Sequence, residues 1–184
     1  MDFWEFSDEQ TKVCRELSHQ FDAISVREDS GIFLCEKYLH MKATLSIDPT
    51  LLLNKEDYEK LIAQIPENRV PFLAAYILDG SEEKNRIVSR IADEKGLKVQ
   101  AFSMDKQASL SVYEWLAVFR DAQFIITDSF HGVVFSIIFE KEYLCLYNKT
   151  RGNNRIESIE RLRKQGMISD LKTQSISFLI RSLS

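Results

Sequence analysis

The sequence predicts an α/β protein with a Rossmann-like, open and mostly parallel sheet that carries helices on both faces. Two observations predict this fold class. Short apolar runs alternate with helical patterns of about ten to fifteen residues along most of the chain, as in successive strand–helix units. One of these runs, residues 72–78, is apolar throughout, as in a parallel strand covered on both faces. Such alternation leads to parallel pairing through crossover helices.

Composition and charge limit the class of protein. The chain has 184 residues, of which 45% are hydrophobic, with only 6 Gly and 3 Pro, so it is not a disordered or collagen-like chain. At roughly 150 residues per domain, the length predicts a single domain over residues 1–184. The formal net charge of −4 provides no basic excess, so we expect no nucleic-acid partner. No apolar run is long enough for a transmembrane segment and no targeting pattern opens the chain, so we expect a cytoplasmic protein.

The cysteines and histidines do not predict a metal site. Cys14, Cys35 and Cys145 are scattered, which is typical of reduced thiols rather than of a disulfide framework. Cys14 precedes His19 by five residues, and Cys35 precedes His40 by the same interval. On a helix this spacing turns the two side chains about 140° apart, so neither pair can share an ion. We therefore expect no metal.

The first third of the chain predicts one strand–helix–strand unit. The patterns give a helix over 8–21, a strand over 23–26, a helix from Ser30, a strand over 43–47 and a connecting helix within 51–65. The stretch from Pro66 to Pro71 has the densest turn signal in the chain, so we expect an internal hinge there.

The remainder of the chain continues the alternation. Strands are predicted over 72–78, 98–102, 124–127 and 143–147, and helices over 82–95, 112–121 and 130–139, followed by two further helices. Gly96 follows the first of these helices at the position where a left-handed residue commonly ends a helix.

Candidate site residues follow the predicted strands. In an open parallel sheet, ligands bind beyond the carboxyl ends of the strands, where helix N-termini present free N–H groups. Four polar segments lie at such positions: 27–28, 48–50, 128–132 and 148–155.

The segment 128–132 is the most informative of the four. Thr127, Asp128 or Ser129 could cap the following helix, a role worth about 1 kcal/mol that needs no ligand. Capping does not explain His131, because the helix macrodipole disfavours an imidazolium in the first turn, where a neutral ring or one facing an anion fits. Gly132 lowers helix propensity, which makes sense where a ligand or another backbone approaches closely.

Arginines occur in two of the other segments. Arg151 and Arg155 flank residues 152–154, an arrangement that suits the binding of a carboxylate or phosphate but also occurs on ordinary surfaces. Arg27 and Glu28 could bind a ligand or could form an ion pair at the end of their strand.

Several segments together resemble the polysaccharide pyruvyl transferase family. They are FDAISVRE with Gly31 after it, DPTLL, the stretch from YEWL through DAQFIITDSFHGVVFSIIF, and Asn148 with RGNNR. Their order and spacing match the family over about residues 3–168.

The resemblance implies a fold and an activity. Members resemble two-lobed, GT-B-like glycosyltransferases, so the chain would be a C-terminal lobe, completed by a separate N-terminal lobe or by a homodimer. The implied activity is transfer of a pyruvyl group from phosphoenolpyruvate to two hydroxyls of a sugar, forming a ketal in cell-surface polysaccharide biosynthesis. The implied partners are a small anionic donor and a sugar or glycan acceptor, with no cofactor.

The resemblance also implies roles for particular residues. His131 would bind the donor or act as a general acid, and Arg27 would hold an anionic group, so both are assigned to catalysis. The expected substrate-binding residues are Glu28, Asp128, Ser129, Gly132, Asn148, Arg151 and Arg155. Ser129 stands where many members carry an arginine. Two alternatives remain: a GT-B-like lobe that binds a nucleotide sugar, and a non-catalytic binding module.

Overall fold

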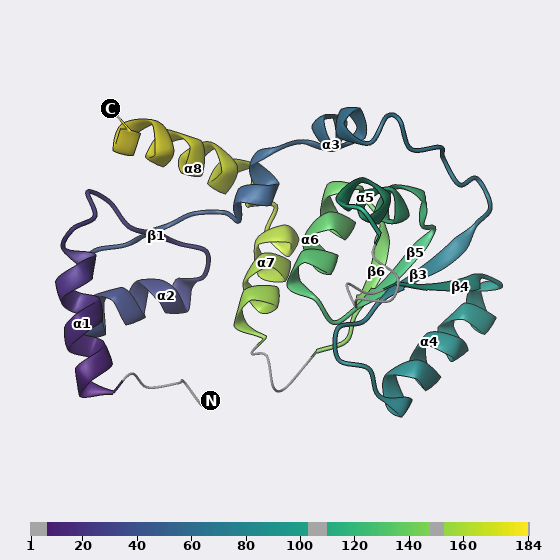
Figure 1. The fold of residues 1–184 in the computed structure, drawn as a ribbon, viewed down its shortest axis with the longest axis horizontal. Helices are drawn as coiled ribbons and strands as arrows, with labels where there is room; N and C mark the ends of the chain where they lie inside the picture. Colours follow the sequence, from purple (N-terminus) through teal and green to yellow (C-terminus); the bar gives the residue numbers. More distant parts are fainter. Residues whose placement is uncertain (1–6, 103–109, 148–152, 184) are drawn as a thin grey trace. The chain divides into compact units, whose positions relative to one another are not determined.

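The computed structural model of the chain describes residues 7–102, 110–147 and 153–183 (Figure 1). The chain divides into two compact units, Met1–Leu52 with Glu157–Ser184, and Leu53–Ile156. The larger unit has a four-stranded parallel sheet and the smaller unit a two-stranded parallel sheet. These sheets and their helices confirm the predicted α/β fold class with a Rossmann-like open sheet. That the whole chain forms one domain stays a prediction.

The sheet of the larger unit has the strand order β4-β3-β5-β6. Its strands are β3 (Phe72–Tyr76), β4 (Lys98–Phe102), β5 (Phe124–Thr127) and β6 (Glu142–Cys145). Its helices are α3 (Lys55–Leu61), α4 (Glu82–Lys95), α5 (Val112–Asp121) and α6 (Phe130–Ile138). Each strand after β3 is reached through one of the last three helices, as the alternation predicts.

Helices cover both faces of strand β3, all five residues of which are buried. Leu73 and Ala75 belong to a core cluster with Val88 and Ala92 of α4. Tyr76 lies on the other face, where its ring centroid is 5.4 Å from that of Trp115 in α5. Because successive side chains of a strand point to opposite faces, a strand inside such a sandwich must be apolar throughout. This explains the apolar run from which the central strand was predicted.

The order of the strands creates a topological switch point between β3 and β5. Helix α4, which follows β3, packs on one face of the sheet. Helix α6, which follows β5, lies on the face of α5, because Phe135 of α6 contacts Trp115 of α5 with ring centroids 5.1 Å apart. The chain therefore leaves two neighbouring strands toward opposite faces. In open parallel sheets, the crevice at such a point is the usual place for a ligand.

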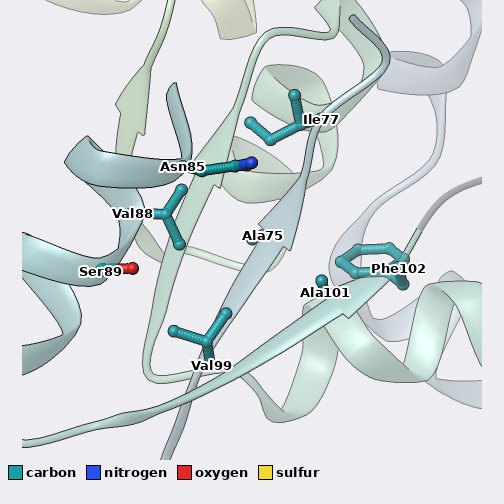
Figure 2. A pocket seen from close by; sticks show the side chains of 8 residues that line it. All are labelled: Ala75, Ile77, Asn85, Val88, Ser89, Val99, Ala101 and Phe102. Carbon is teal, nitrogen blue, oxygen red and sulfur yellow. The ribbon is translucent and has the colours of Figure 1, made fainter. Parts of the chain in front are cut away.

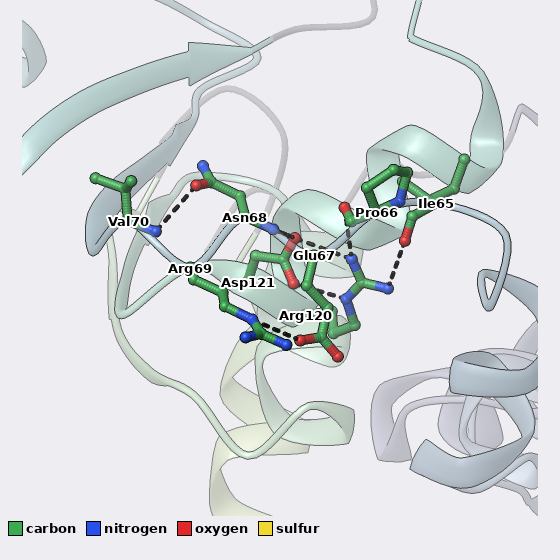
Figure 3. A network of polar contacts seen from close by, with 8 residues as sticks. All are labelled: Ile65, Pro66, Glu67, Asn68, Arg69, Val70, Arg120 and Asp121. Atoms are coloured by element: carbon green, nitrogen blue, oxygen red, sulfur yellow. Dashed lines mark hydrogen bonds and ion pairs between the residues drawn. The ribbon is translucent and has the colours of Figure 1, made fainter.

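The loop that precedes β3 is tied to the end of helix α5 (Figure 3). The guanidinium of Arg120 donates to the carbonyls of Ile65 and Pro66 at 3.2 and 3.3 Å. The carboxylate of Asp121 accepts from the backbone N–H of Asn68 at 2.8 Å. A hinge was predicted in this proline-flanked stretch, but the chain passes from one compact unit to the other at Leu52–Leu53.

The smaller unit contains a strand–helix–strand motif. Its elements are α1 (Asp8–Ser18), β1 (Ser25–Val26), α2 (Asp29–Leu34), the π-helical turn Cys35–Leu39, β2 (Thr44–Leu45), the 3-10 turn Pro49–Leu52 and α8 (Ile168–Leu183). Helix α7 (Asn154–Lys164) begins in the larger unit. The buried hydroxyl of Ser175 in α8 accepts from the backbone N–H of Ile47 at 2.8 Å, which fixes the chain just after β2.

The predicted boundaries were most accurate in the larger unit. Four elements match at both ends: α4, β4, α5 and β5. Gly96 ends α4 with a φ of 64°, as its position predicted. In the smaller unit the predicted strands were too long, because β1 and β2 pair over only two residues each. The predicted helix 8–21 ends at Ser18, and the predicted helix within 51–65 is a 3-10 turn followed by α3.

Helix α6 lies very close to the end of β5, and this closeness depends on Gly132. A Cβ atom at residue 132 would lie 2.1 Å from Oγ1, 2.8 Å from Cβ and 2.9 Å from Cγ2 of Thr127. Thr127 is fully buried, and its Cβ is fixed to the backbone, so no rotation of its side chain removes the clash.

We expect Gly132→Ala to lower the free energy of unfolding by about 1–3 kcal/mol, the usual cost of overpacking a core. Gly80→Ala is the matched control, because a Cβ at residue 80 meets nothing within 4 Å. Urea unfolding followed by circular dichroism measures both variants. Equal stability of the two variants would contradict this account of Gly132.

Candidate active site

The junction between β5 and α6 holds the central candidate residues. Ser129 is the N-cap of α6, and its hydroxyl accepts from the backbone N–H of Gly132 at 3.4 Å. Its own N–H donates to Oγ1 of Thr127 at 3.1 Å. Ser129 is buried, and of the three possible capping residues it is the one that caps the helix. That Ser129 also binds substrate stays a prediction.

His131 lies in the first turn of α6 with an exposed side chain. Its ring meets the ring of Phe130 edge-on, with centroids 5.3 Å apart. The guanidinium carbon of Arg155, in the first turn of α7, lies 5.3 Å from the centroid of the same Phe130 ring. Phe130 thus brings together two residues that are 24 positions apart in the sequence, a histidine and an arginine that were both predicted as site residues.

The guanidinium of Arg155 has no ion-pair partner among the residues that the structure describes. A cation–π contact uses the face of a guanidinium and leaves the N–H groups at its edge able to bind a carboxylate or a phosphate. A histidine and an arginine thus lie against the same aromatic ring. We call Phe130, His131 and Arg155 the imidazole–guanidinium cluster.

Asp128, which directly follows β5, is buried. Its carboxylate accepts from the backbone N–H groups of Leu78 and Asp79 at 2.6 and 3.1 Å, in the loop after β3. It also accepts from Nζ of Lys84 at 2.6 Å. Because its side chain is 0% exposed, these contacts hold the loop in place, and a direct contact with substrate stays a prediction.

Lys84 was not among the predicted site residues. It lies among charged residues at the start of α4, and a lysine there usually belongs to a solvated face. Its partner Asp128 is 44 residues away in the sequence, and the two meet because β3 and β5 are neighbours in the sheet. A local sequence pattern does not indicate this contact. Knowledge of the strand order would have indicated that the two residues can meet.

Gly132 is buried, and the space beside it is filled by the side chain of Thr127. A ligand or another backbone was predicted to approach this glycine closely. The neighbour is the end of the preceding strand, so packing of helix on strand accounts for the glycine.

Arg27 and Glu28 lie in the smaller unit, after strand β1. Arg27 forms an ion pair with Asp48, which follows β2, and Asp48 is only 4% exposed. Thr50 donates to the same carboxylate from its backbone N–H at 3.0 Å and from its hydroxyl at 2.6 Å. Glu28 is the N-cap of α2 and makes no capping hydrogen bond with its side chain. Their roles toward a substrate stay predictions.

The environment of Asp48 lowers its pKa. Burial acts to raise this pKa, but the hydrogen bonds from Thr50, the hydrogen bond from Arg27 and the charge of Arg27 together outweigh burial. The carboxylate is therefore held in its charged form.

Two further predicted site residues, Asn148 and Arg151, lie outside the described residues.

A cavity of about 420 Å³ lies between β3, β4 and α4, on the face of β3 opposite the side chain of Tyr76 (Figure 2). Its lining is mainly apolar and includes Val88, Val99 and Phe102, with Asn85 and Ser89 as polar members. It contains none of the predicted site residues.

Two further searches bear on the predictions of metal and membrane. Within residues 7–102, 110–147 and 153–183, the structure has no group of three or more His, Cys, Asp or Glu side chains placed to hold a metal ion. In the same ranges no helix is both long enough and apolar enough to cross a membrane.

Comparison with known proteins gives one match. The family whose sequence model matches the chain is described as polysaccharide pyruvyl transferase, and the match covers residues 3–150. It includes the β5–α6 junction and strand β1 with Arg27. No curated protein and no solved structure matches the chain significantly.

The lowered pKa of Asp48 predicts acid sensitivity. A carboxyl whose pKa is lower in the folded state contributes stability above its ordinary pKa of 3.8 and loses that contribution as the pH falls through the folded value. We expect Asp48→Asn to be less stable than the wild type by about 1–3 kcal/mol at pH 7, with a difference that shrinks steadily below pH 4. Urea unfolding of both proteins between pH 7 and pH 2.5 measures this difference in the free energy of unfolding. A difference that stays constant over this range would contradict the prediction.

Proposed function

The chain belongs to the polysaccharide pyruvyl transferase family, and on this basis we propose that it transfers a pyruvyl group from phosphoenolpyruvate to two hydroxyls of a sugar in cell-surface polysaccharide biosynthesis. The product is a cyclic ketal, and the leaving group is inorganic phosphate. The acceptor is a sugar or glycan, and we propose that the reaction takes place in the cytoplasm without a cofactor.

The chemistry sets the requirements for the site. A proton must be added to the methylene carbon of phosphoenolpyruvate, which leaves an oxocarbenium character at the carbon that bears the phosphate. One sugar hydroxyl then attacks this carbon and gives its proton to the deprotonated acid, phosphate departs, and the second hydroxyl closes the ring and gives its proton to the phosphate. The site must therefore supply one general acid, and cations for the carboxylate and the phosphate of the donor.

The observation that carries the proposal is the imidazole–guanidinium cluster beside the topological switch point. His131 is exposed and is the type of side chain most often used as a general acid. Arg155 shares the Phe130 ring with it and presents N–H groups that suit a carboxylate or a phosphate. We assign the proton to His131 and the binding of an anionic group of the donor to Arg155.

The position of His131 at a helix start supports binding of an anionic donor at this junction. The first N–H groups of a helix have no partner within the helix and carry a partial positive charge. Of these, the N–H of Gly132 is taken by Ser129. An anionic group of the donor beside the first turn of α6 would meet the remaining N–H groups as well as the His131 ring.

The donor can be tested directly by isothermal titration with phosphoenolpyruvate and with a panel of nucleotide sugars. We expect heat of binding with phosphoenolpyruvate, and release of inorganic phosphate when an acceptor sugar is added. Heat with nucleotide sugars alone would replace the proposal by a glycosyltransferase-like lobe. No binding of either ligand and no turnover would indicate a non-catalytic binding module.

The role of His131 predicts a specific variant. We expect His131→Gln to lower kcat for phosphate release by roughly 100-fold or more, because general acid–base catalysis is typically worth two to four orders of magnitude. His19→Gln is the matched control, since His19 is an exposed residue at the end of α1 and should keep wild-type turnover. Equal kcat values for His131→Gln and the wild type would remove His131 from the mechanism.

A further inference from the structure

The ion pair between Lys84 and Asp128 is unlike the other ion pairs on helix α4. Its two side chains are 15% and 0% exposed, whereas those of Arg90 and Glu94 are 66% and 57% exposed. Nζ of Lys84 donates to the carboxylate of Asp128 at 2.6 Å and to the carbonyl of Asp79 at 2.8 Å. The pair is therefore an integral part of the interior at the carboxyl end of the sheet.

The pair connects the two loops that meet at the switch point. Lys84 lies in the first turn of α4, whose loop follows β3, and Asp128 directly follows β5. Asp128 also holds the backbone N–H groups of Leu78 and Asp79 in the loop after β3. Two backbone donors of the loop after β3 and one side-chain donor of α4 thus hold the carboxylate of Asp128, three residues before His131.

Stability alone is a poor explanation for such a pair. Removing two charges from water is costly, and a well-packed apolar pair of similar volume is often as stable as a buried ion pair or more so. An apolar pair cannot, however, hold a loop by directed hydrogen bonds. The arrangement is therefore better suited to fixing a conformation than to stabilising the fold.

Lys84 is poorly placed to bind the donor itself. Its charge is balanced by Asp128, and two of its three N–H donors are already used. An anion near Lys84 would meet the carboxylate of Asp128 as well. A role as the missing cation of the donor site is thus less consistent with these contacts than a role through Asp128.

We infer that Lys84 and Asp128 form a positioning pair that sets the orientation of the β5–α6 junction and thereby of the His131 ring. The consequence for catalysis rests on the proposed function, whereas the consequence for the ring of His131 does not. The pair acts through the backbone from residue 128 to residue 131 and does not contact the substrate.

The first experiment observes the His131 ring by NMR, independently of activity. The chain has 3 histidines, so the ring signals are few, and His131→Gln assigns the signal of interest. We expect Lys84→Met to shift or broaden the His131 signal and to leave that of His19 in place. Lys84→Arg, which keeps a charged donor, should give a His131 signal close to that of the wild type. Arg90→Met is the control, because it removes a charge from the exposed side of the same helix.

The second experiment uses phosphate release. If His131 is misplaced in Lys84→Met, we expect kcat to fall roughly 10- to 100-fold and KM for phosphoenolpyruvate to change less than about threefold. Lys84→Arg should recover most of the lost kcat, and Arg90→Met should have wild-type values. If Lys84→Met does not fold, as judged by its melting curve, Lys84→Gln takes its place and should give intermediate effects in both experiments.

The two experiments separate the failure of this inference from the failure of the proposed function. An unchanged His131 signal in a folded Lys84→Met or Lys84→Gln protein would overturn the positioning role. A rise in KM with kcat unchanged would also overturn it, because Lys84 would then be a ligand of the donor. A wild-type chain without turnover would contradict the proposed function, but the NMR experiment would still decide the role of the pair.

Discussion

The arrangement of the larger unit depends on where one carboxylate lies. Asp128 has no exposed side-chain surface and accepts hydrogen bonds from Leu78, Asp79 and Lys84, all of which follow the neighbouring strand β3. A buried carboxylate is tolerated only where donors replace the water that it has lost. The loop after β3 and the start of α6 must therefore stay together, and the exposed His131 lies on the structure that they form.

The smaller unit repeats this design with different residues. In both units a β-branched residue ends a strand, and a glycine five positions later, in the first turn of the next helix, packs against it: Val26 with Gly31, and Thr127 with Gly132. In both units a nearly buried aspartate pairs with a basic residue that follows the neighbouring strand: Asp48 with Arg27, and Asp128 with Lys84. Close packing of helix on strand and an ion pair between strand ends thus position the candidate residues on each sheet.

Local signals explain how much of this was predictable. Helices α4 and α5 were predicted at both ends, and their caps are local: Gly96, which was predicted to end α4, does so, and Ser81 and Ser111 cap the two starts. His131 was predicted as a site residue because an imidazole in a first helical turn needs an explanation. Lys84 was missed because its role depends on which strands are neighbours. The β1–β2 pair was overestimated because apolar sequence continues beyond the residues that pair.

We propose that the donor binds at the carboxyl end of β5, beside His131 and Arg155. A crystal structure of the chain grown with phosphoenolpyruvate tests it most directly. The account predicts the carboxylate or phosphate of the donor within hydrogen-bonding distance of the His131 ring and the Arg155 guanidinium. Phosphoenolpyruvate bound in the cavity between β3, β4 and α4 instead, with no contact to the His131 ring, would contradict it.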